Sequence, residues 1–293
     1  MIIVKLQGGL GNQMFQYALG RNLSLRHNTE LKLDLTFLLD RTPKENFVYR
    51  AYEMGEFNIQ AAIATESELK KYRWKDSNNR VYRKLNYFVR YPFHRYVKER
   101  HFHFDEQVLQ APRNVYLSGY WQSHKYFQDI ENVISSDFAF NDRLILKNRS
   151  LAEQAASSNY ICLNVRRGDF VTNPSFSSIH GVCENAYFYD ALFFMKERLQ
   201  NPEILVFSDD IEWCRKNLRF DCPAVFMDFD GSSHGYLYLM SLCKHFIIPN
   251  STFGWWAAWL CTYAHKIVIA PKKWFNDPNI DTSDVTPSSW LRM

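Results

Sequence analysis

The sequence has few residues that interrupt regular structure and no long apolar run. Of its 293 residues only 11 are glycine and 10 are proline, which excludes collagen-like and low-complexity proteins. No window approaches the roughly 20 consecutive apolar residues that a membrane-spanning helix needs. The most apolar stretch, from Phe246 to Cys261, is interrupted at Pro249. These absences favour an ordinary globular protein.

The six cysteines include no C-x-x-C pair, and several of them lie within apolar runs. This distribution is typical of reduced core residues in a cytosolic protein. Met1 is followed directly by the strand-like run Ile2–Leu6, without a charged leader or a cleavage site, so we expect no signal peptide. The sequence therefore predicts a cytoplasmic protein, either free or peripheral to a membrane.

The charge balance argues against a nucleic-acid partner. The formal net charge is only +4 and the basic residues form no single long run, which leaves an anionic small molecule or a membrane surface as candidate partners. Neither a G-x-S-x-G nor a P-loop sequence occurs, so hydrolases of those kinds are not favoured. The length suffices for two compact lobes or for one large α/β domain.

The chain opens with a strand, a glycine-rich turn and a helix. The turn is Gly8–Gln13, and apolar residues recur at helical spacing from Met14 onward. Backbone amides in such a turn can bind an anion at close range. A second strand, Glu30–Asp34, ends in a carboxylate that could bind a ribose, as in an NAD-dependent oxidoreductase. However, Met14 stands where the third small residue of the dinucleotide fingerprint belongs.

The remainder of the chain predicts two lobes of α/β structure. The polar stretch Asn141–Ser158 is expected to connect them, with a boundary at residue 150. From Tyr160 to Ala270 apolar strands alternate with helical segments, which is typical of a doubly wound parallel sheet. Ligands of such sheets bind beyond the carboxyl ends of the strands. Four polar stretches follow predicted strands there: Arg166–Asp169, Ser208–Asp210, Asp228–Asp230 and Asn250–Phe253.

Two adjacent arginines at a strand end suit a diphosphate. Each guanidinium can bind phosphate oxygens bidentately and keeps its charge. An ion pair of Arg166 or Arg167 with Asp169 fits the motif by itself equally well. Ser208–Asp210 can cap the following helix, and so can Ser251 and Thr252, whose neighbouring amides can also receive a phosphate.

A metal site is not favoured at either place where the sequence suggests one. Asp228 and Asp230 form a D-x-D pair, which holds a divalent ion on a nucleotide diphosphate in many sugar transferases. Here two arginines and a glycine-rich turn already supply positive potential, so we predict no metal ion. The pair His101 and His103 lacks an acidic or third ligand nearby.

Four stretches in the same order resemble glycosyltransferase family 11, the α-1,2-fucosyltransferases, over nearly the whole chain. They are Gly8–Ala18, Arg166–Asp169, Phe207–Asp210 and Met240–Leu260. The resemblance implies a GT-B-like α/β fold with two Rossmann-like lobes facing a cleft. It assigns an acceptor-side lobe to residues 1–150 and a nucleotide-sugar-binding lobe, with the doubly wound sheet, to residues 151–293.

The resemblance also implies an enzyme that uses GDP-β-L-fucose as donor, without a metal ion or other cofactor. Such an enzyme inverts the configuration of the anomeric carbon and forms an α-1,2 link to a galactoside. The acceptor would be an oligosaccharide or a lipid-linked glycan. Bacterial members decorate O-antigen or capsule, which fits a protein of the cytoplasm or of the inner face of the inner membrane.

The motifs provide a set of site residues. We expect catalytic roles for Arg166, Arg167 and Asp169, with the arginines on the β-phosphate. Donor binding is expected from residues of both lobes: Gly9, Gly11, Asn12, Gln13, Asn164, Ser208, Asp209, Asp210, Asn250, Ser251, Thr252 and Phe253.

Two positions depart from the family's pattern and keep alternatives open. Asn164 stands where the family usually has histidine, and Tyr236 where it usually has an acidic residue. Asparagine still offers an amide to a purine edge, whereas tyrosine cannot accept two N–H donors from guanine as a carboxylate does. His234, Asp228 or Asp230 are candidates for the missing contact. The alternatives are a transferase with another nucleotide-sugar donor, an NAD-dependent oxidoreductase, and a non-catalytic glycan- or nucleotide-binding protein.

Overall fold

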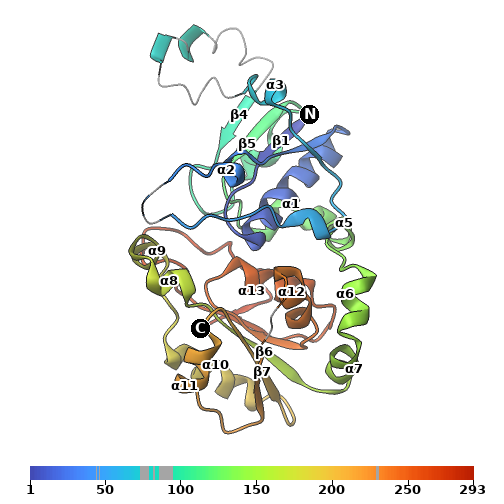
Figure 1. Cartoon of the computed structure of the whole chain (residues 1–293), viewed down its shortest axis with the longest axis vertical. Helices are drawn as coiled ribbons and strands as arrows, with labels where there is room; N and C mark the ends of the chain where they lie inside the picture. Colours follow the sequence, from blue (N-terminus) through green and yellow to red (C-terminus); the bar gives the residue numbers. More distant parts are fainter. Residues whose placement is uncertain (44, 46, 73–78, 82, 86–94, 229–230) are drawn as a thin grey trace. The chain divides into compact units, whose positions relative to one another are not determined.

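The computed structural model describes residues 1–43, 45, 47–72, 79–81, 83–85, 95–228 and 231–293, which form two compact units (Figure 1). Unit 1 consists mainly of Met1–Pro43 and Tyr49–Ala139, together with Ser283–Val285. Unit 2 consists mainly of Phe140–Thr282 and Thr286–Met293. Each unit is built around its own parallel sheet.

The polar stretch that was expected to connect the lobes is helical and belongs to unit 2. It forms α6 (Asp142–Lys147) and α7 (Arg149–Ser157), and the division between the units follows Ala139 rather than residue 150. The physical reason is local capping, since the side chain of Asn141 accepts a hydrogen bond from the amide of Leu144 at 2.9 Å. The polar residues from Asn141 onward, which resemble a linker in the sequence, therefore form the beginning of α6.

The sheet of unit 1 has the strand order β3-β2-β1-β5-β4 among the described residues, and all its pairings are parallel. The predicted opening of strand, turn and helix is confirmed by β1 and α1, and α1 buries Met14, Phe15 and Leu19. The strands are β1 (Ile2–Lys5), β2 (Leu31–Asp34), β3 (Ala62–Ile63), β4 (Arg95–Lys98) and β5 (Val115–Ser118). The helices are α1 (Leu10–Arg26), α2 (Thr36–Leu39), η1 (Met54–Glu56), α3 (Glu66–Leu69), η3 (Glu106–Gln110), η4 (His124–Tyr126), η5 (Gln128–Ile130) and α5 (Glu131–Asp137).

The sheet of unit 2 has the order β11-β10-β9-β6-β7-β8, again with parallel pairings, so the predicted doubly wound parallel sheet is confirmed. Helices α10 and α11 lie on one face of β6 and β7, and α12 and α13 lie on the other (Figure 1). The strands are β6 (Tyr160–Val165), β7 (Glu203–Ser208), β8 (Ala224–Phe226), β9 (His245–Ile247), β10 (Val268–Ala270) and β11 (Leu291–Arg292). The remaining helices are α8 (Gly168–Thr172), α9 (Pro174–His180), α10 (Asn185–Lys196), α11 (Ile211–Asn217), α12 (Ser233–Ser241) and α13 (Thr252–Leu260).

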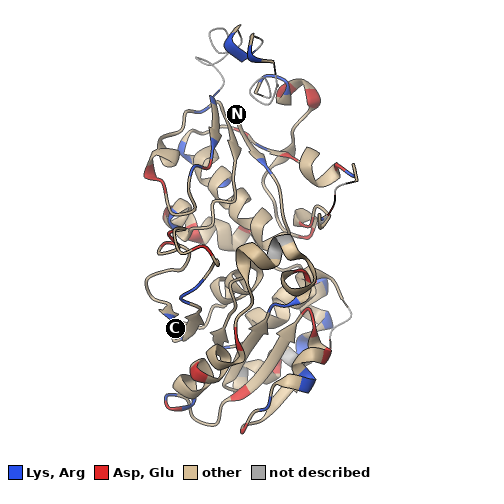
Figure 2. Ribbon diagram, turned by 90° about the vertical axis from the view of Figure 1, so that its left-hand side faces the viewer, with Lys and Arg blue, Asp and Glu red and all other residues tan. Residues whose placement is uncertain are grey.

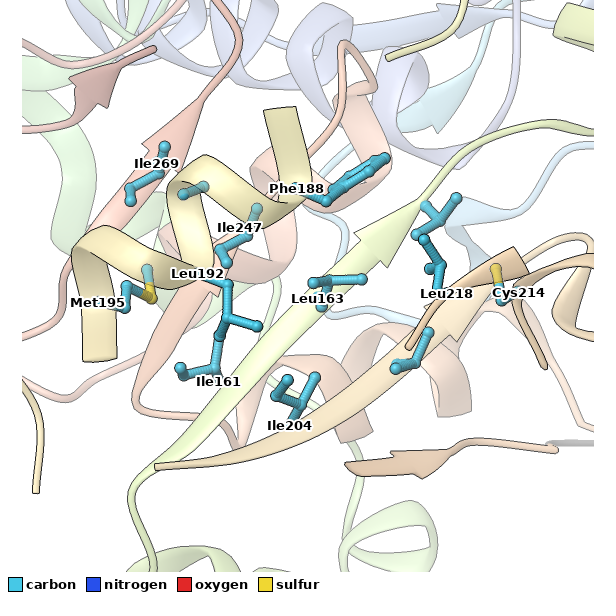
Figure 3. Packing of buried hydrophobic residues seen from close by; sticks show 13 residues of the cluster. Ile161, Leu163, Phe188, Leu192, Met195, Ile204, Cys214, Leu218, Ile247 and Ile269 are labelled. Carbon is cyan, nitrogen blue, oxygen red and sulfur yellow. The ribbon is translucent and has the colours of Figure 1, made fainter. Parts of the chain in front are cut away.

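The core of unit 2 fills the space between its sheet and α10. Figure 3 shows Phe188, Leu192 and Met195 of α10 above the sheet, with Ile161 and Leu163 of β6 beneath them. All five side chains are at most 4% exposed. Burial of this size is the main favourable term in folding, and it fixes β6, whose end carries the arginine pair.

In each sheet the strand order reverses at one place. β1 lies between β2 and β5 in unit 1, and β6 lies between β7 and β9 in unit 2. Open parallel sheets bind ligands outside the carboxyl ends of the strands at such a switch point. A ligand site is therefore expected at the segments that follow β1 and β5 in unit 1, and at those that follow β6 and β9 in unit 2.

The described residues were compared with what a nucleic-acid or membrane partner would require, namely a basic surface or an apolar spanning helix. Lys and Arg are interspersed with Asp and Glu along both units (Figure 2). Within the described part of the chain, no helix combines the length and the apolar character needed to cross a membrane.

Candidate functional site

The arginine pair follows β6 directly, at the switch point of unit 2. Arg166 lies between two carboxylates: its Nη1 is 2.9 Å from Oδ2 of Asp209, and its Nη2 donates to Oδ1 of Asp169. Its Cζ also lies 5.4 Å from the centre of the Phe170 ring. The ion pair that the sequence allowed is thus present, together with a second one from a residue remote in sequence.

Arg167 is held in a different way. Its Cζ lies 3.6 Å from the centre of the Trp213 ring on α11, a cation–π contact of about 0.5–2 kcal/mol. Its Nε is 3.6 Å from Oδ2 of Asp210, too far for a hydrogen bond. Among the described residues this buried Nε has no hydrogen-bond partner. Arg167 therefore has an orientation set by the indole of Trp213 and by the carboxylate of Asp210 nearby.

Asp209 joins the two arginines. Its Oδ1 accepts a hydrogen bond from the backbone amide of Arg167 at 2.8 Å, while its Oδ2 pairs with Arg166. A Cβ added at Gly168 would lie 2.3 Å from Oδ2 of Asp209, so a larger residue there would displace this carboxylate from its contacts. The carboxylate thus fixes both arginines from the end of the neighbouring strand β7.

The segment Ser208–Asp210 has the capping role that the sequence predicted. The side chain of Asp210 accepts from the amide of Trp213 at 3.2 Å and caps α11, and Oγ of Ser208 accepts from the amide of Asp210 at 3.0 Å. The sequence analysis did not single out Trp213. Its position three residues after the cap was the available signal, because a residue there lies in the first turn of α11, close to the end of β7.

Asn164 and Tyr236, the two positions that depart from the family's pattern, both contact backbone. Asn164 is 6% exposed, and its Nδ2 donates to the carbonyl of Phe207 at 3.2 Å. The hydroxyl of Tyr236 accepts from the amide of Ser208 at 2.9 Å and lies 3.4 Å from the carbonyl of Met227. Burial raises the pKa of Tyr236. Tyr236 therefore joins the ends of β7 and β8 as a neutral hydroxyl.

The stretch after β9 lies beside the arginine pair in the sheet order. Asn250 is buried, and its Nδ2 donates to the carbonyls of His180 at 2.9 Å and Trp274 at 3.1 Å. Ser251 is the N-cap residue of α13, but its side chain makes no capping hydrogen bond, so this capping prediction is wrong. The backbone of Ser251 is extended, and its side chain is partly exposed. Thr252 and Phe253 form the first turn of α13, and both are partly exposed.

The glycine-rich turn lies at the switch point of unit 1. Gln13 is fully buried, and its Nε2 donates to the carbonyls of Gly8 at 2.9 Å and Ala51 at 2.8 Å. The side chain of Gln13 thus stabilises the loop, and its role in donor binding stays a prediction. Gly9 is the N-cap residue of α1, and a Cβ there would meet nothing within 4 Å.

Two further residues of α1 belong to the predicted donor site. Oδ1 of Asn12 accepts from Nε2 of Gln122 at 3.0 Å, which joins the turn after β1 to the segment after β5. Gly11 lies buried in the first turn of α1. The donor contacts of both residues stay predictions.

The carboxylate expected of an NAD-dependent oxidoreductase is enclosed by the protein. Asp34 is 0% exposed, and it accepts hydrogen bonds from the Tyr116 hydroxyl at 2.6 Å and from the Thr36 amide at 2.9 Å. A ribose could reach it only if both bonds broke. This alternative therefore has no support in the geometry of unit 1.

The places where the sequence suggested a metal ion hold no cluster of ligands among the described residues. No three His, Cys, Asp or Glu side chains gather there. Asp228 is highly exposed and lies 3.7 Å from Nη2 of Arg215, whereas Asp230 is outside the described residues. The rings of His101 and His103 stack on each other with centres 3.6 Å apart.

A family model matches the complete chain, since the model for "Glycosyl transferase family 11" covers residues 1–293. The chain belongs to glycosyltransferase family 11. It is 32% identical to an alpha-1,2-colitosyltransferase of Escherichia coli, over 100% of this chain and 99% of that protein. It is also 32% identical to the O-antigen biosynthesis glycosyltransferase WbnK of Escherichia coli, over 98% of this chain and 99% of that protein.

Similarity extends to animal enzymes and to a solved plant structure. The galactoside alpha-(1,2)-fucosyltransferase 1 of Saimiri boliviensis boliviensis is 30% identical over 154 residues, which cover 49% of this chain and 42% of that protein. A mutant form of Arabidopsis thaliana FUT1 in complex with GDP superposes with a TM-score of 0.50 at 13% identity, covering 91% of this chain and 69% of that one. The glycosyltransferase accordingly has the GT-B-like α/β fold that the sequence predicted, with two Rossmann-like units.

Proposed function

We propose that this glycosyltransferase moves L-fucose from GDP-β-L-fucose to the 2-hydroxyl group of a galactoside in a surface glycan. The observation that carries the proposal is the arginine pair at the switch point of unit 2, fixed by Asp209 and Trp213. Relatives named for galactoside α-1,2-fucosyl transfer and for O-antigen biosynthesis support the sugar and the glycan. The GDP in the plant structure supports the nucleotide.

The arginines would act on the leaving group. As the bond between the anomeric carbon and the phosphate oxygen lengthens, negative charge grows on GDP, and fixed positive groups that meet this charge lower the barrier. A guanidinium carries five N–H donors, so Arg166 can still donate to a phosphate oxygen while it pairs with Asp169 and Asp209. Because the carboxylates already orient the arginines, little reorganisation is needed during transfer.

The amino end of α13 is the second part of the proposed diphosphate site. Its position beside β6 follows from the pairing of β6 with β9. The first amides of a helix bind phosphate well, and the extended Ser251 leaves its hydroxyl without a capping bond. Ser251 and Thr252 would then hold one phosphate and the arginines the other.

A second candidate donor is GDP-L-colitose, the 3-deoxy counterpart of GDP-L-fucose. A relative that is 32% identical, over 100% of this chain and 99% of that protein, is named for colitosyl transfer. The two donors share the nucleotide and the diphosphate, so the arginine pair and α13 would serve both equally.

A ligand panel followed by a transfer assay tests the proposed function. We expect GDP, GDP-fucose and GDP-colitose to raise the thermal midpoint of unfolding, and UDP-sugars and NAD to leave it unchanged. One of the two GDP-sugars should then label a β-galactoside, with the new link at the 2-hydroxyl by NMR. Stabilisation by UDP-sugars alone would refute the nucleotide assignment, and stabilisation by GDP without transfer to any galactoside would indicate a binding protein.

Transfer is expected to proceed in EDTA at the rate measured with added magnesium or manganese. The reason is that Arg166 and Arg167 supply the positive charge that a metal ion supplies elsewhere. The protein is first treated with a 10-fold excess of chelator and passed through a gel-filtration column to remove residual metal. The initial rate of transfer is then measured. A rate that vanishes in EDTA and returns with manganese would instead support a metal site at Asp228 and Asp230.

A further inference from the structure

The two arginines after β6 are oriented by partners of different kinds. Arg166 pairs with the carboxylates of Asp169 and Asp209. Arg167 instead places its guanidinium on the indole of Trp213, with 3.6 Å between Cζ and the ring centre. A carboxylate neutralises the charge that it orients, whereas an aromatic ring attracts a cation through its quadrupole and has no net charge of its own. Trp213 therefore orients Arg167 without cancelling its charge.

The contact of Arg167 with a carboxylate is loose by comparison. Among the described residues Asp210 is the carboxylate within ion-pair distance, and its Oδ2 lies 3.6 Å from Nε of Arg167, beyond hydrogen-bond distance. The side chain of Asp210 is 42% exposed, so water weakens the attraction. The side chain of Arg167 is only 18% exposed. The position of this enclosed guanidinium thus depends mainly on the indole.

Trp213 has a fixed place because α11 begins beside the end of β7. The side chain of Asp210 caps this helix by accepting from the amide of Trp213 at 3.2 Å. The indole is partly buried and packs against the core of unit 2. The next residue, Cys214, is fully buried in the same core, so a rotation of the first turn of α11 would break this packing. The indole is therefore a rigid support for the guanidinium.

We propose that Trp213 is a positioning residue for the donor diphosphate and acts through Arg167, an inference that rests on the proposed function. The indole holds the guanidinium in the orientation in which it meets the charge that develops on the leaving GDP. Stabilisation of this kind depends on groups that are in place before the reaction begins. Asp210, Trp213 and Arg167 all belong to unit 2.

Removal of the aromatic ring tests this role. Trp213→Leu should lower kcat/KM for the donor by about 2- to 30-fold, which corresponds to the energy of a cation–π contact. Trp213→Phe should lie between this variant and the wild type, because phenylalanine offers a cation a weaker ring face than tryptophan does. A wild-type kcat/KM in Trp213→Leu would overturn the proposal.

A fluorinated ring separates the electrostatic role of the indole from its packing. Tetrafluorotryptophan, incorporated only in place of Trp213, nearly preserves the shape of the ring but weakens the negative potential of its face. The thermal midpoint of unfolding should stay at the wild-type value, while kcat/KM should fall toward that of Trp213→Leu. If the indole only fills space, kcat/KM will also stay at the wild-type value, and the proposal is wrong.

A double-mutant cycle tests whether Trp213 acts through Arg167. In the Arg167→Ala background the guanidinium is gone, so Trp213→Leu should cause no further loss of kcat/KM. A second loss as large as the one in the wild-type background would show that Trp213 acts by another route and would overturn the proposal.

Phe194→Leu on α10 is the matched control. Cζ of Arg198 lies 3.6 Å from the centre of the Phe194 ring, the same distance as in the pair of Arg167 and Trp213. Phe194 is also partly buried against the core of unit 2, near the carboxyl end of α10, where the chain returns to the start of β7. Its kcat/KM should equal that of the wild type. An equal loss in this variant would indicate a general effect of losing such a stack and would contradict a specific role of Trp213.

The affinity for GDP separates this inference from the proposed function. If the wild-type protein binds GDP but transfers no sugar to a galactoside, the proposed function is refuted. The same cycle, measured by calorimetry on the dissociation constant for GDP, then still decides the role of Trp213. If Trp213→Leu fails to fold, Trp213→Phe and the fluorinated protein decide it. A wild-type protein that does not bind GDP would refute both.

Discussion

Replacing Arg166 with alanine is expected to lower the rate of sugar transfer by at least about a hundredfold. Loss of one fixed donor to a developing negative charge costs about 3 kcal/mol of transition-state stabilisation. The same change removes one cationic partner from each of Asp169 and Asp209, so the two carboxylates would repel a diphosphate at the proposed site more strongly. Arg167→Ala should show a loss of similar size, because it removes the guanidinium held on Trp213.

The measurement is kcat/KM for the donor, with the thermal midpoint and GDP binding recorded for each variant. Arg149→Ala is the matched control, since Arg149 lies on the same unit, is 73% exposed and pairs only with Glu153 among the described residues. Its rate should equal that of the wild type. Arg166→Lys should recover only part of the loss, because the single ammonium group of lysine cannot bind two carboxylates and a phosphate at once as a planar guanidinium group can. Full activity in both alanine variants would show that the arginines do not bind the diphosphate.

Leu163→Ala is expected to destabilise unit 2 by about 2–5 kcal/mol. Leu163 is fully buried in β6 beneath α10, and its removal leaves a cavity that the packed neighbours fill only in part (Figure 3). Leu146→Ala on α6 is the matched control, because that leucine is 67% exposed and its loss should cost less than about 0.5 kcal/mol.

Urea unfolding followed by tryptophan fluorescence separates the two leucine variants. Leu163→Ala should shift the midpoint to lower urea, and Leu146→Ala should leave it in place. Equal midpoints for the two variants would mean that burial in this core does not govern the stability of unit 2. The core matters for function as well, because β6 carries Arg166 and Arg167 at its end.

The pattern within short stretches was sufficient to predict much of the fold. The alternation of apolar strands and helices after Tyr160 depends on residues close in sequence, and so does the strand, turn and helix at the amino terminus. The capping role of Asp210 was predictable for the same reason. Because open parallel sheets bind ligands beyond the carboxyl ends of their strands, the sequence also predicted a ligand site at the arginine pair, and the structure places that pair directly after β6 at the switch point of unit 2.

Two local interpretations changed once packing was known. The stretch from Asn141 was expected to be a connection, but its asparagine caps α6. Ser251 was expected to cap α13, but its hydroxyl makes no such bond. In both cases the partner that decides the role is set by the folded backbone.

The sequence by itself determined the family, the α/β class and the residue types at the sheet edges. The tertiary structure decided which of these residues meet. Arg166 pairs with Asp209 and Arg167 stacks on Trp213 only because β6 and β7 are adjacent in the sheet. Glu99 accepts a hydrogen bond from the amide of Trp121 only because β4 and β5 are adjacent. Such contacts join residues far apart along the chain, and strand order, which no local pattern encodes, brings them together.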